Sequence, residues 1–278
     1  MASIAVILIT YNEEKNIERC LRSVSWADEV FVIDSLSTDK TIELAKQFTS
    51  NILQHTYDGD IKQRERGFSL AKSDWLFYID ADEEVSDELK TTIQQAINNE
   101  QAKDGYYVQR RNEIFGKWIY HGGWFPDETF RLFKKDRYFA EFEEVHGGFS
   151  VRGNKGRLDG FLNHYPYETI EQYLAKMNDY TSLQVSNKLK QSPEIHFSWA
   201  KIFFSPISHF LRKFFSTKGY KDGMHGFVLA VLGAIYTFAL YAKCREYALR
   251  AKEGKGLLPP ITNLELLKHK RPGMSASE

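Results

Sequence analysis

The alternation of short apolar runs with amphipathic stretches in residues 1–110 constrains the fold more than any other feature of the sequence. The runs are rich in β-branched and aromatic residues, as expected of strands that are covered on both faces. They are Ile4–Ile9, Glu29–Ile33, Ile52–His55 and Trp75–Ile79. Between them, apolar residues recur at helical spacing, first at Ile17, Cys20 and Leu21. This order predicts an α/β fold with a mostly parallel central sheet flanked by helices.

Polar residues in front of two helical stretches predict where these helices begin. Ser37 or Thr38 is the expected cap of the helix that follows the second strand. Ser86 is the expected cap of a later helix, and the acids Glu83 and Glu84 before it are interpreted as residues that favour its start.

Three of the predicted strands are followed by polar side chains at the point where each strand ends. These are Thr10, Tyr11, Asn12 and Glu13 after the first strand, Asp34 after the second, and Asp80 and Asp82 after the last. Ligands of open α/β sheets bind beyond the carboxyl ends of the strands, so these groups are expected to face one crevice. Carboxylate oxygens suit Mg²⁺ or Mn²⁺, which typically bridges a protein and a substrate diphosphate. The pattern alone fits a plain helix N-terminus equally well.

Four segments occur in the order found in one enzyme family. They are VILITYNEEKNIERCLRSV, DEVFVIDSLSTDKTIELAKQF, QRERGFSLAKSDWLFYIDADEE and YYVQRRNEIFGKWIYHGGWFPDETFRLFKK. Together they resemble family 2 glycosyltransferases with the GT-A fold. The likeness is greatest to the β-1,4-glucosyltransferases that build the lipopolysaccharide inner core in Gram-negative bacteria. It covers residues 1–185 in detail and implies a Rossmann-like sheet that binds a nucleotide sugar, usually a UDP-sugar.

The resemblance also implies roles for single residues. The positions that line the nucleobase pocket match Thr10, Tyr11 and Glu13, and the acid that hydrogen-bonds the base matches Asp34. The further matches are Arg64 for a basic residue near the nucleotide, Asp80 for the acid near the ribose and Asp82 for the metal ligand on the diphosphate.

Two positions depart from the family pattern. Leu36 stands where the family often has Gly, and Glu65 stands where it often has Asn. Leucine disfavours a turn that needs positive φ, so the base contact of Asp34 is less well supported than the role of Asp82.

Inverting transfer needs a general base that deprotonates the acceptor hydroxyl. The order of family motifs favours Glu144, then Glu143, with Asp127 as the third candidate, although each also fits a surface acid. Relatives commonly show a Val-His-Glu string here, whereas this chain has Gly147 after His146. Some GT-A enzymes use a histidine as a nitrogen ligand of the metal, which makes His146 or His164 a candidate.

The segment HGGWFPD is a candidate acceptor-binding loop. Gly122 and Gly123 let the backbone approach a ligand closely. Trp124 offers a flat face to a sugar ring, and His121 can bond a hydroxyl. A tight hairpin with a packed tryptophan is the alternative.

The C-terminal part differs from the rest in charge. From Trp199 to Glu278 there are 13 Lys/Arg and 5 Asp/Glu, whereas residues 1–198 carry 24 and 32. This region also contains two aromatic, apolar stretches, KIFFSPISHFLRKFF and GFVLAVLGAIYTFALYA. A basic, apolar extension favours contact with anionic lipid, and a buried helical pair is the alternative. No nucleic-acid motif accompanies the basic residues, so no nucleic-acid partner is expected.

These observations predict three regions. Residues 1–190 form the GT-A domain, 191–258 a helical, membrane-associating extension, and 259–278 a disordered tail. The function expected is inverting, metal-dependent transfer of glucose from UDP-glucose to a heptose of lipid A–core, at the cytoplasmic face of the inner membrane. Only two cysteines and no visible signal peptide agree with the cytoplasm. The alternatives are another glycolipid, capsule or protein-glycan acceptor, and an inactive nucleotide-sugar-binding membrane partner.

Overall fold

The computed structural model describes residues 1–141, 148–191 and 199–253. By its internal contacts the chain divides into two compact units. The first comprises Met1–Arg111 and Pro126–Tyr165, and the second comprises Asn112–Phe125 and the chain from Pro166 onwards. The predicted domain boundaries near residues 190 and 258 lie at or inside ranges that the structure does not describe, so they remain predictions.

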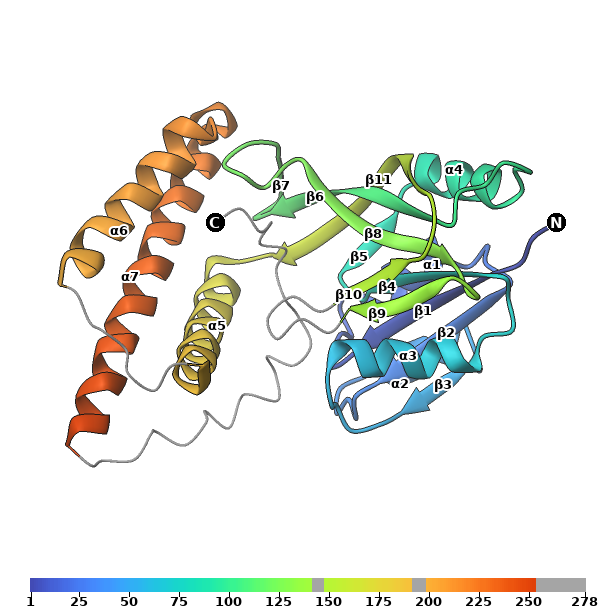
Figure 1. The fold of residues 1–278 in the computed structure, drawn as a ribbon, viewed down its shortest axis with the longest axis horizontal. Coiled ribbons are helices and arrows are strands. Elements are labelled where there is room, and N and C mark those ends of the chain that lie inside the picture. Colours follow the sequence, from blue (N-terminus) through green and yellow to red (C-terminus); the bar gives the residue numbers. More distant parts are fainter. Residues whose placement is uncertain (142–147, 192–198, 254–278) are drawn as a thin grey trace. The chain divides into compact units, whose positions relative to one another are not determined.

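The main sheet has nine strands, parallel in its first half and antiparallel beyond it (Figure 1). In spatial order its strands are β3 (Ile52–Gln54), β2 (Glu29–Asp34), β1 (Ile4–Thr10), β4 (Trp75–Asp80), β8 (Asp127–Lys134), β6 (Gly105–Ile114), β11 (Lys155–Tyr167) and β5 (Glu83–Val85), with β7 (Lys117–Ile119) paired to β6. The strands β9 (Tyr138–Glu141) and β10 (Gly148–Val151) form a separate ribbon. The parallel pairing of β3, β2, β1 and β4 agrees with the parallel sheet that the strand and helix pattern predicts.

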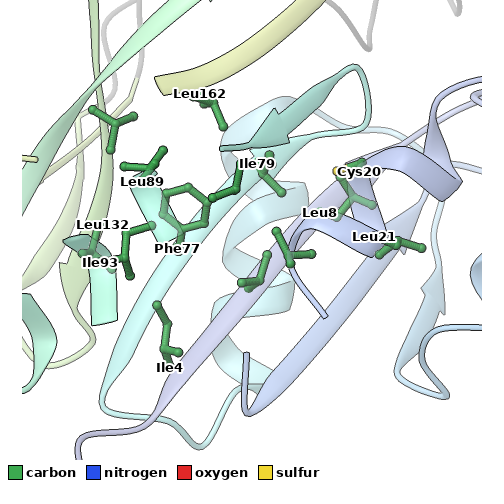
Figure 2. Close-up of a cluster of buried hydrophobic side chains, with 14 of the residues drawn as sticks. Ile4, Leu8, Cys20, Leu21, Phe77, Ile79, Leu89, Ile93, Leu132 and Leu162 are labelled. Carbon is green, nitrogen blue, oxygen red and sulfur yellow. The ribbon is translucent and has the colours of Figure 1, made fainter. Parts of the chain in front are cut away.

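Both faces of β1 are buried, which explains its continuous apolar sequence. On one face, Val6 and Leu8 pack with residues of α1 (Ile17–Ser23) and α4 (Asp87–Ile97), as Figure 2 shows for Leu8 and its neighbours. On the other face, Ile7 packs with Phe68 of α3 (Asp60–Leu70). Alternate residues of one strand therefore hold the helix layers on opposite faces of the sheet.

The helix starts agree with the sequence in one case and differ in two. Ser86 caps α4, because its Oγ accepts a hydrogen bond of 3.2 Å from the Leu89 N–H. The predicted cap of α2 (Thr41–Ala45) was wrong, because the N-cap residue is Lys40, without a side-chain cap bond, and the Ser37 hydroxyl bonds to Asp34 instead. The interpretation of Glu83 and Glu84 as helix-starting acids was also wrong, because both lie in β5.

The second unit is helical. It contains α5 (Ile170–Gln191), α6 (Trp199–Leu211), a π-helical turn (Arg212–Ser216), the 3₁₀ helix η2 (Gly219–Asp222) and α7 (Met224–Lys252). The helices α6 and α7 pack side by side (Figure 1). Tyr173 of α5 and Leu229 of α7 share one apolar cluster with Ile119 of β7. Over Met224–Arg250, α7 is long and apolar enough to cross a membrane, judged by length and composition alone.

Candidate active site

Three strand ends meet at one edge of the sheet. Thr10 of β1 pairs with Asp34 of β2, and Ile9 of β1 pairs with Asp80 of β4. Because these strands are parallel neighbours, the predicted nucleotide-binding residues Thr10, Asp34 and Asp80 leave the sheet side by side. The hydroxyl of Thr10 is buried and has no hydrogen-bond partner among the described residues, which leaves it able to bond a ligand.

The Asp34 carboxylate shapes the turn that follows β2. It accepts hydrogen bonds from the backbone N–H of Ser37 at 2.9 Å, from the Ser37 hydroxyl and from Gln54 Nε2 at 2.9 Å. Leu36 lies inside this turn with φ of +66° and is 49% exposed. The turn therefore keeps the left-handed backbone that favours glycine, although leucine occupies the position.

The loop after β1 is tied to this turn. The Asn12 N–H donates to Ser37 Oγ at 2.9 Å, and Asn12 Oδ1 accepts from the Thr38 N–H at 2.8 Å. The Glu13 N–H donates to Thr41 Oγ1 at 2.7 Å, so residues of both loops share one set of hydrogen bonds. Tyr11 is half-buried in the same loop. These contacts fix the backbone around the predicted nucleobase pocket.

Asp80 is held by two arginines. Arg64 Nη2 lies 2.6 Å from Asp80 Oδ1, and Arg131 Nη2 lies 3.3 Å from Asp80 Oδ2. Both guanidinium groups also contact the Tyr78 ring, at 4.9 and 4.7 Å from its centroid. Burial by itself would raise the pKa of Asp80, but the positive charges of Arg64 and Arg131 outweigh it and lower the pKa to about 2. Asp80 is therefore a carboxylate at any physiological pH.

Glu83 extends the ion pairs of Asp80 into a larger network. Its fully buried carboxylate accepts from Arg131 Nη2 at 2.7 Å, from Arg110 Nη1 at 3.3 Å and from the Asp80 N–H at 2.9 Å. Arg110 in turn bonds Asp127 at 2.8 Å. Sequence reasoning missed Glu83, Arg110 and Arg131, since their neighbours lie up to 51 residues away in the chain. Asp127, the third candidate for the base, is thus an ion-paired carboxylate.

Asp82 lies beside a histidine. Asp82 Oδ2 and His164 Nε2 are 3.5 Å apart, and the two residues are 2% and 4% exposed. Pairing of β5 with β11 creates this contact, because His164 is opposite Glu83. Ligands about 2.1 Å from one metal ion and at right or tetrahedral angles lie about 3–3.5 Å apart, so this oxygen and nitrogen fit a shared divalent cation.

The protein alone does not surround such a cation. In the ranges 1–141, 148–191 and 199–253, no group of three or more His, Cys, Asp and Glu side chains could hold a metal. The remaining ligands would come from a substrate diphosphate and water, as is common for Mg²⁺. The other candidates Glu143, Glu144 and His146 lie outside the described residues.

Residues 121–125 of the candidate acceptor loop belong to the second unit. Gly122 and Gly123 have φ of +68° and +75°, and a Cβ at Gly123 would lie 2.7 Å from Lys213 Nζ. Trp124 packs against the apolar cluster of the second unit, and its carbonyl accepts from Asn112 Nδ2 at 3.0 Å. The His121 side chain remains 32% exposed and bonds Asp222. His121 and Trp124 are thus both half-buried.

The model of the family described as "Glycosyl transferase family 2" matches residues 5–152, more than half of the 278-residue chain. The chain belongs to glycosyl transferase family 2. This family 2 glycosyltransferase is therefore an enzyme that transfers sugars. Its family and its partly parallel sheet confirm the predicted GT-A class, and all of the described strand-end residues lie inside the matched range, apart from His164.

Two relatives extend the similarity over both units. A glycosyltransferase of Rickettsia typhi is 31% identical over 272 residues, which cover 91% of this chain and 90% of the relative. The lipopolysaccharide core biosynthesis glycosyltransferase LpsC of Rhizobium meliloti is 27% identical over 263 residues, which cover 90% of this chain and 94% of LpsC. Because the family model stops at residue 152, these relatives share the helical second unit as well.

Two solved structures show a weaker likeness. TarS of S. aureus in complex with UDP-GlcNAc has a TM-score of 0.44 and 14% identity, and the match covers 91% of this chain and 92% of TarS. Glucosyl-3-phosphoglycerate synthase from Mycobacterium tuberculosis in complex with Mn²⁺ and UDP-glucose has a TM-score of 0.34 and 22% identity, over 40% of this chain and 44% of the synthase. Likeness at this level says nothing about the ligands of this chain.

Proposed function

We propose that this glycosyltransferase transfers glucose from UDP-glucose to a heptose of lipopolysaccharide inner core, with inversion at the anomeric carbon and with a divalent cation. The observation that carries the proposal is the buried pair of Asp82 and His164 beside the strand-end residues Thr10, Asp34 and Asp80. The relative LpsC, named for lipopolysaccharide core biosynthesis, supports the choice of acceptor.

Each part of the strand-end site has a role in this proposal. Asp82 and His164 would hold the cation, which neutralises charge on the departing diphosphate. Asp34 and the joined loops after β1 and β2 form the pocket for the base, with Thr10, Tyr11 and Glu13. Asp80, fixed by Arg64 and Arg131, receives the ribose. Glu144 or Glu143 takes the proton of the acceptor hydroxyl, because Arg110 already neutralises Asp127.

The second unit supports a lipid-linked acceptor at the inner-membrane surface. Phe203, Ile207 and Leu211 of α6 are exposed and recur every four residues, so they form one stripe along the helix. The basic residues Lys201 and Arg212 precede and follow these three residues in the sequence. An exposed apolar stripe on a helix that also carries basic residues has the composition of a helix that lies on anionic lipid. We therefore propose that the protein acts at the cytoplasmic face of the inner membrane.

Release of UDP from a panel of nucleotide sugars tests the donor half of the proposal. With Mn²⁺ or Mg²⁺ present, we expect slow release of UDP from UDP-glucose, and EDTA should abolish it. Asp82→Asn should lower turnover by at least about 100-fold, the scale of losing a group that stabilises the leaving charge. Asp136→Asn, which removes a largely exposed carboxylate of the same unit, should match the wild type.

The outcomes separate the candidate functions. If no donor is bound or hydrolysed, the site assignment fails, and both nucleotide-sugar functions fail with it. Binding of UDP-glucose without release, even with lipid A–core added, would favour an inactive binding partner. Transfer to another glycolipid, to capsule or to a protein glycan, but not to a heptose acceptor, would keep the chemistry and replace the acceptor.

A further inference from the structure

The short helix η2 places a buried carboxylate between α6 and α7. Asp222 ends η2 and is 5% exposed. The turn around it is tightly built, since a Cβ at Gly226 would lie 1.8 Å from the Gly219 carbonyl oxygen. Lys218 before η2 and Gly223 after it both have positive φ. The backbone therefore fixes where the Asp222 side chain points.

The Asp222 side chain reaches the candidate acceptor loop, about a hundred residues earlier in the sequence. One carboxylate oxygen accepts the backbone N–H of His121 at 2.8 Å. The other lies 3.1 Å from His121 Nδ1 and 3.4 Å from the Tyr120 N–H. Lys117 Nζ donates to the main-chain oxygen of Asp222 at 2.8 Å, which fastens the same segment a second time. The pair lies wholly within the second unit.

The chemistry of a carboxylate settles the state of the imidazole. A carboxylate only accepts hydrogen bonds, so Nδ1 of a neutral His121 must carry the hydrogen. Nε2 then keeps its lone pair. Free histidine in water prefers the opposite tautomer, so Asp222 selects a state with one defined acceptor atom on a ring that is 32% exposed.

We propose that Asp222 is a positioning residue for acceptor binding. It holds His121 in the Nδ1–H tautomer, and His121 Nε2 accepts a hydrogen bond from a hydroxyl of the acceptor sugar. The proposal rests on the proposed transfer to a saccharide and deepens it by naming the atom that recognises this substrate. A ring in the other tautomer would present an N–H to that hydroxyl and could not take its hydrogen.

Asp222→Asn is the informative variant, because it keeps the shape and changes the pattern of donors. The Asn oxygen is expected to take the 2.8 Å hydrogen bond from the His121 backbone N–H, since the amide nitrogen cannot accept it. The amide NH₂ then faces His121 Nδ1 and forces the ring into the Nε2–H tautomer. Glu246→Gln is the matched control, because it removes an exposed carboxylate from α7 of the same unit.

Nitrogen-15 NMR of the histidine side chains reads the tautomer directly and needs no activity. At a pH where the rings are neutral, we expect Nδ1–H for His121 in the wild type and in Glu246→Gln, and Nε2–H in Asp222→Asn. His225, which lies 3.4 Å from the Phe115 carbonyl, should not change and serves as the internal reference. Nε2–H at His121 in the wild type would overturn the proposal, even if Asp222→Asn failed to fold.

Kinetics then test the role. Asp222→Asn should raise KM for the acceptor about tenfold, the effect of one lost hydrogen bond. KM for the nucleotide sugar and release of UDP to water should stay at wild-type values. An unchanged acceptor KM, or an equal loss in donor hydrolysis, would overturn the positioning role. If the wild type turns over no donor, the proposed function fails, whereas the tautomer is still decided by NMR.

Discussion

The first unit buries its charges in pairs, whereas the second leaves large apolar side chains exposed. In the first, Arg64, Asp80, Arg131, Glu83, Arg110 and Asp127 form one chain of ion pairs in which no side chain is more than 22% exposed. In the second, Phe203 and Phe204 of α6 are 61% and 69% exposed. Burying a charge costs free energy unless the charge is paired. Leaving a phenylalanine side chain exposed forgoes the free energy that its burial would contribute.

This contrast indicates what kind of partner each unit suits. Buried ion pairs fix the direction of a carboxylate, which suits a site that must hold a charged nucleotide in one geometry. Exposed apolar stripes acquire their value only when a second apolar phase covers them. The first unit thus suits a polar ligand and the second suits contact with an apolar surface, and four experiments can break or sharpen this difference.

The largest effect is expected from removing Glu83. Glu83→Ala leaves Arg131 and Arg110 buried beside each other with too little negative charge, so we expect a loss of about 3–5 kcal/mol in the free energy of unfolding. Glu84→Ala is the neighbouring control. Glu84 is only partly buried and bonds Tyr165 and Asn163, so its loss should cost about 1–2 kcal/mol. Urea unfolding of the full chain measures both, and equal losses would mean that the ion-pair chain does not set the stability of this unit.

The exposed apolar side chains of α6 should matter for vesicle binding and not for folding. Changing Phe203 and Phe204 together to Ser should weaken binding to vesicles that contain anionic phospholipid by at least about tenfold, since each buried phenylalanine contributes roughly 1.5–3 kcal/mol. Stability should stay within about 0.5 kcal/mol. Leu70→Ser removes a 47% exposed side chain of the first unit and should leave binding unchanged. Flotation with vesicles decides the matter, and equal binding by all three proteins would refute the surface assigned to α6.

Acid should loosen the second unit before the first. Burial, with Lys213 and Arg212 nearby, lowers the pKa of His209 to about 4, so its ring packs neutral against Gly233 and near Thr237. An unfolded histidine binds a proton near pH 6.5, and the folded one does so only near pH 4. Stability is thus complete above about pH 6.5 and falls as the pH drops towards 4, by roughly 1–2 kcal/mol at pH 5 for a partly exposed ring.

Hydrogen exchange of α6 and α7 peptides at pH 7 and 5, corrected for intrinsic rates, measures this loss. The His209→Gln variant cannot take up the proton. The protection of its α6 and α7 peptides from hydrogen exchange should therefore depend less on pH. In the first unit, Asp80 keeps its charge down to about pH 2, so β4 peptides should show little change over this range. Parallel loss in both units would erase the predicted difference.

The sequence predicts the parts of this molecule that depend on local pattern. The continuous apolar runs identified β1, β2 and β4, because burial on both faces leaves no room for alternation. The acids at Asp34 and Asp80 could be placed at one edge because parallel strands end together. Ser86 was found as a cap because its partner is three residues away.

The features that the sequence did not predict depend on contacts between residues that are far apart in the chain. Glu83 and Glu84 were assigned to a helix start, yet pairing with β11, some eighty residues later, draws them into a strand. Ser37 and Thr38 have the chemistry of caps, but their hydroxyls donate hydrogen bonds to Asp34 and Asn12 instead. Nothing in the sequence around Asp222 predicted a role for it, because its hydrogen-bond partner His121 is distant in the sequence.

The smallest effect concerns Leu36, where the sequence suggested that a left-handed turn would be disfavoured. The turn forms nonetheless, held by the Asp34 carboxylate through Ser37 and Gln54. Leucine at φ of +66° carries a cost of roughly 1 kcal/mol that glycine avoids, and its 49% exposed side chain gains little from burial. Leu36→Gly should therefore stabilise the first unit by about 0.5–1 kcal/mol, whereas Leu70→Gly, at the last residue of helix α3, should destabilise it slightly. Urea unfolding distinguishes the two signs, and destabilisation by Leu36→Gly would show that the Leu36 side chain, rather than the Asp34 hydrogen bonds, maintains this turn.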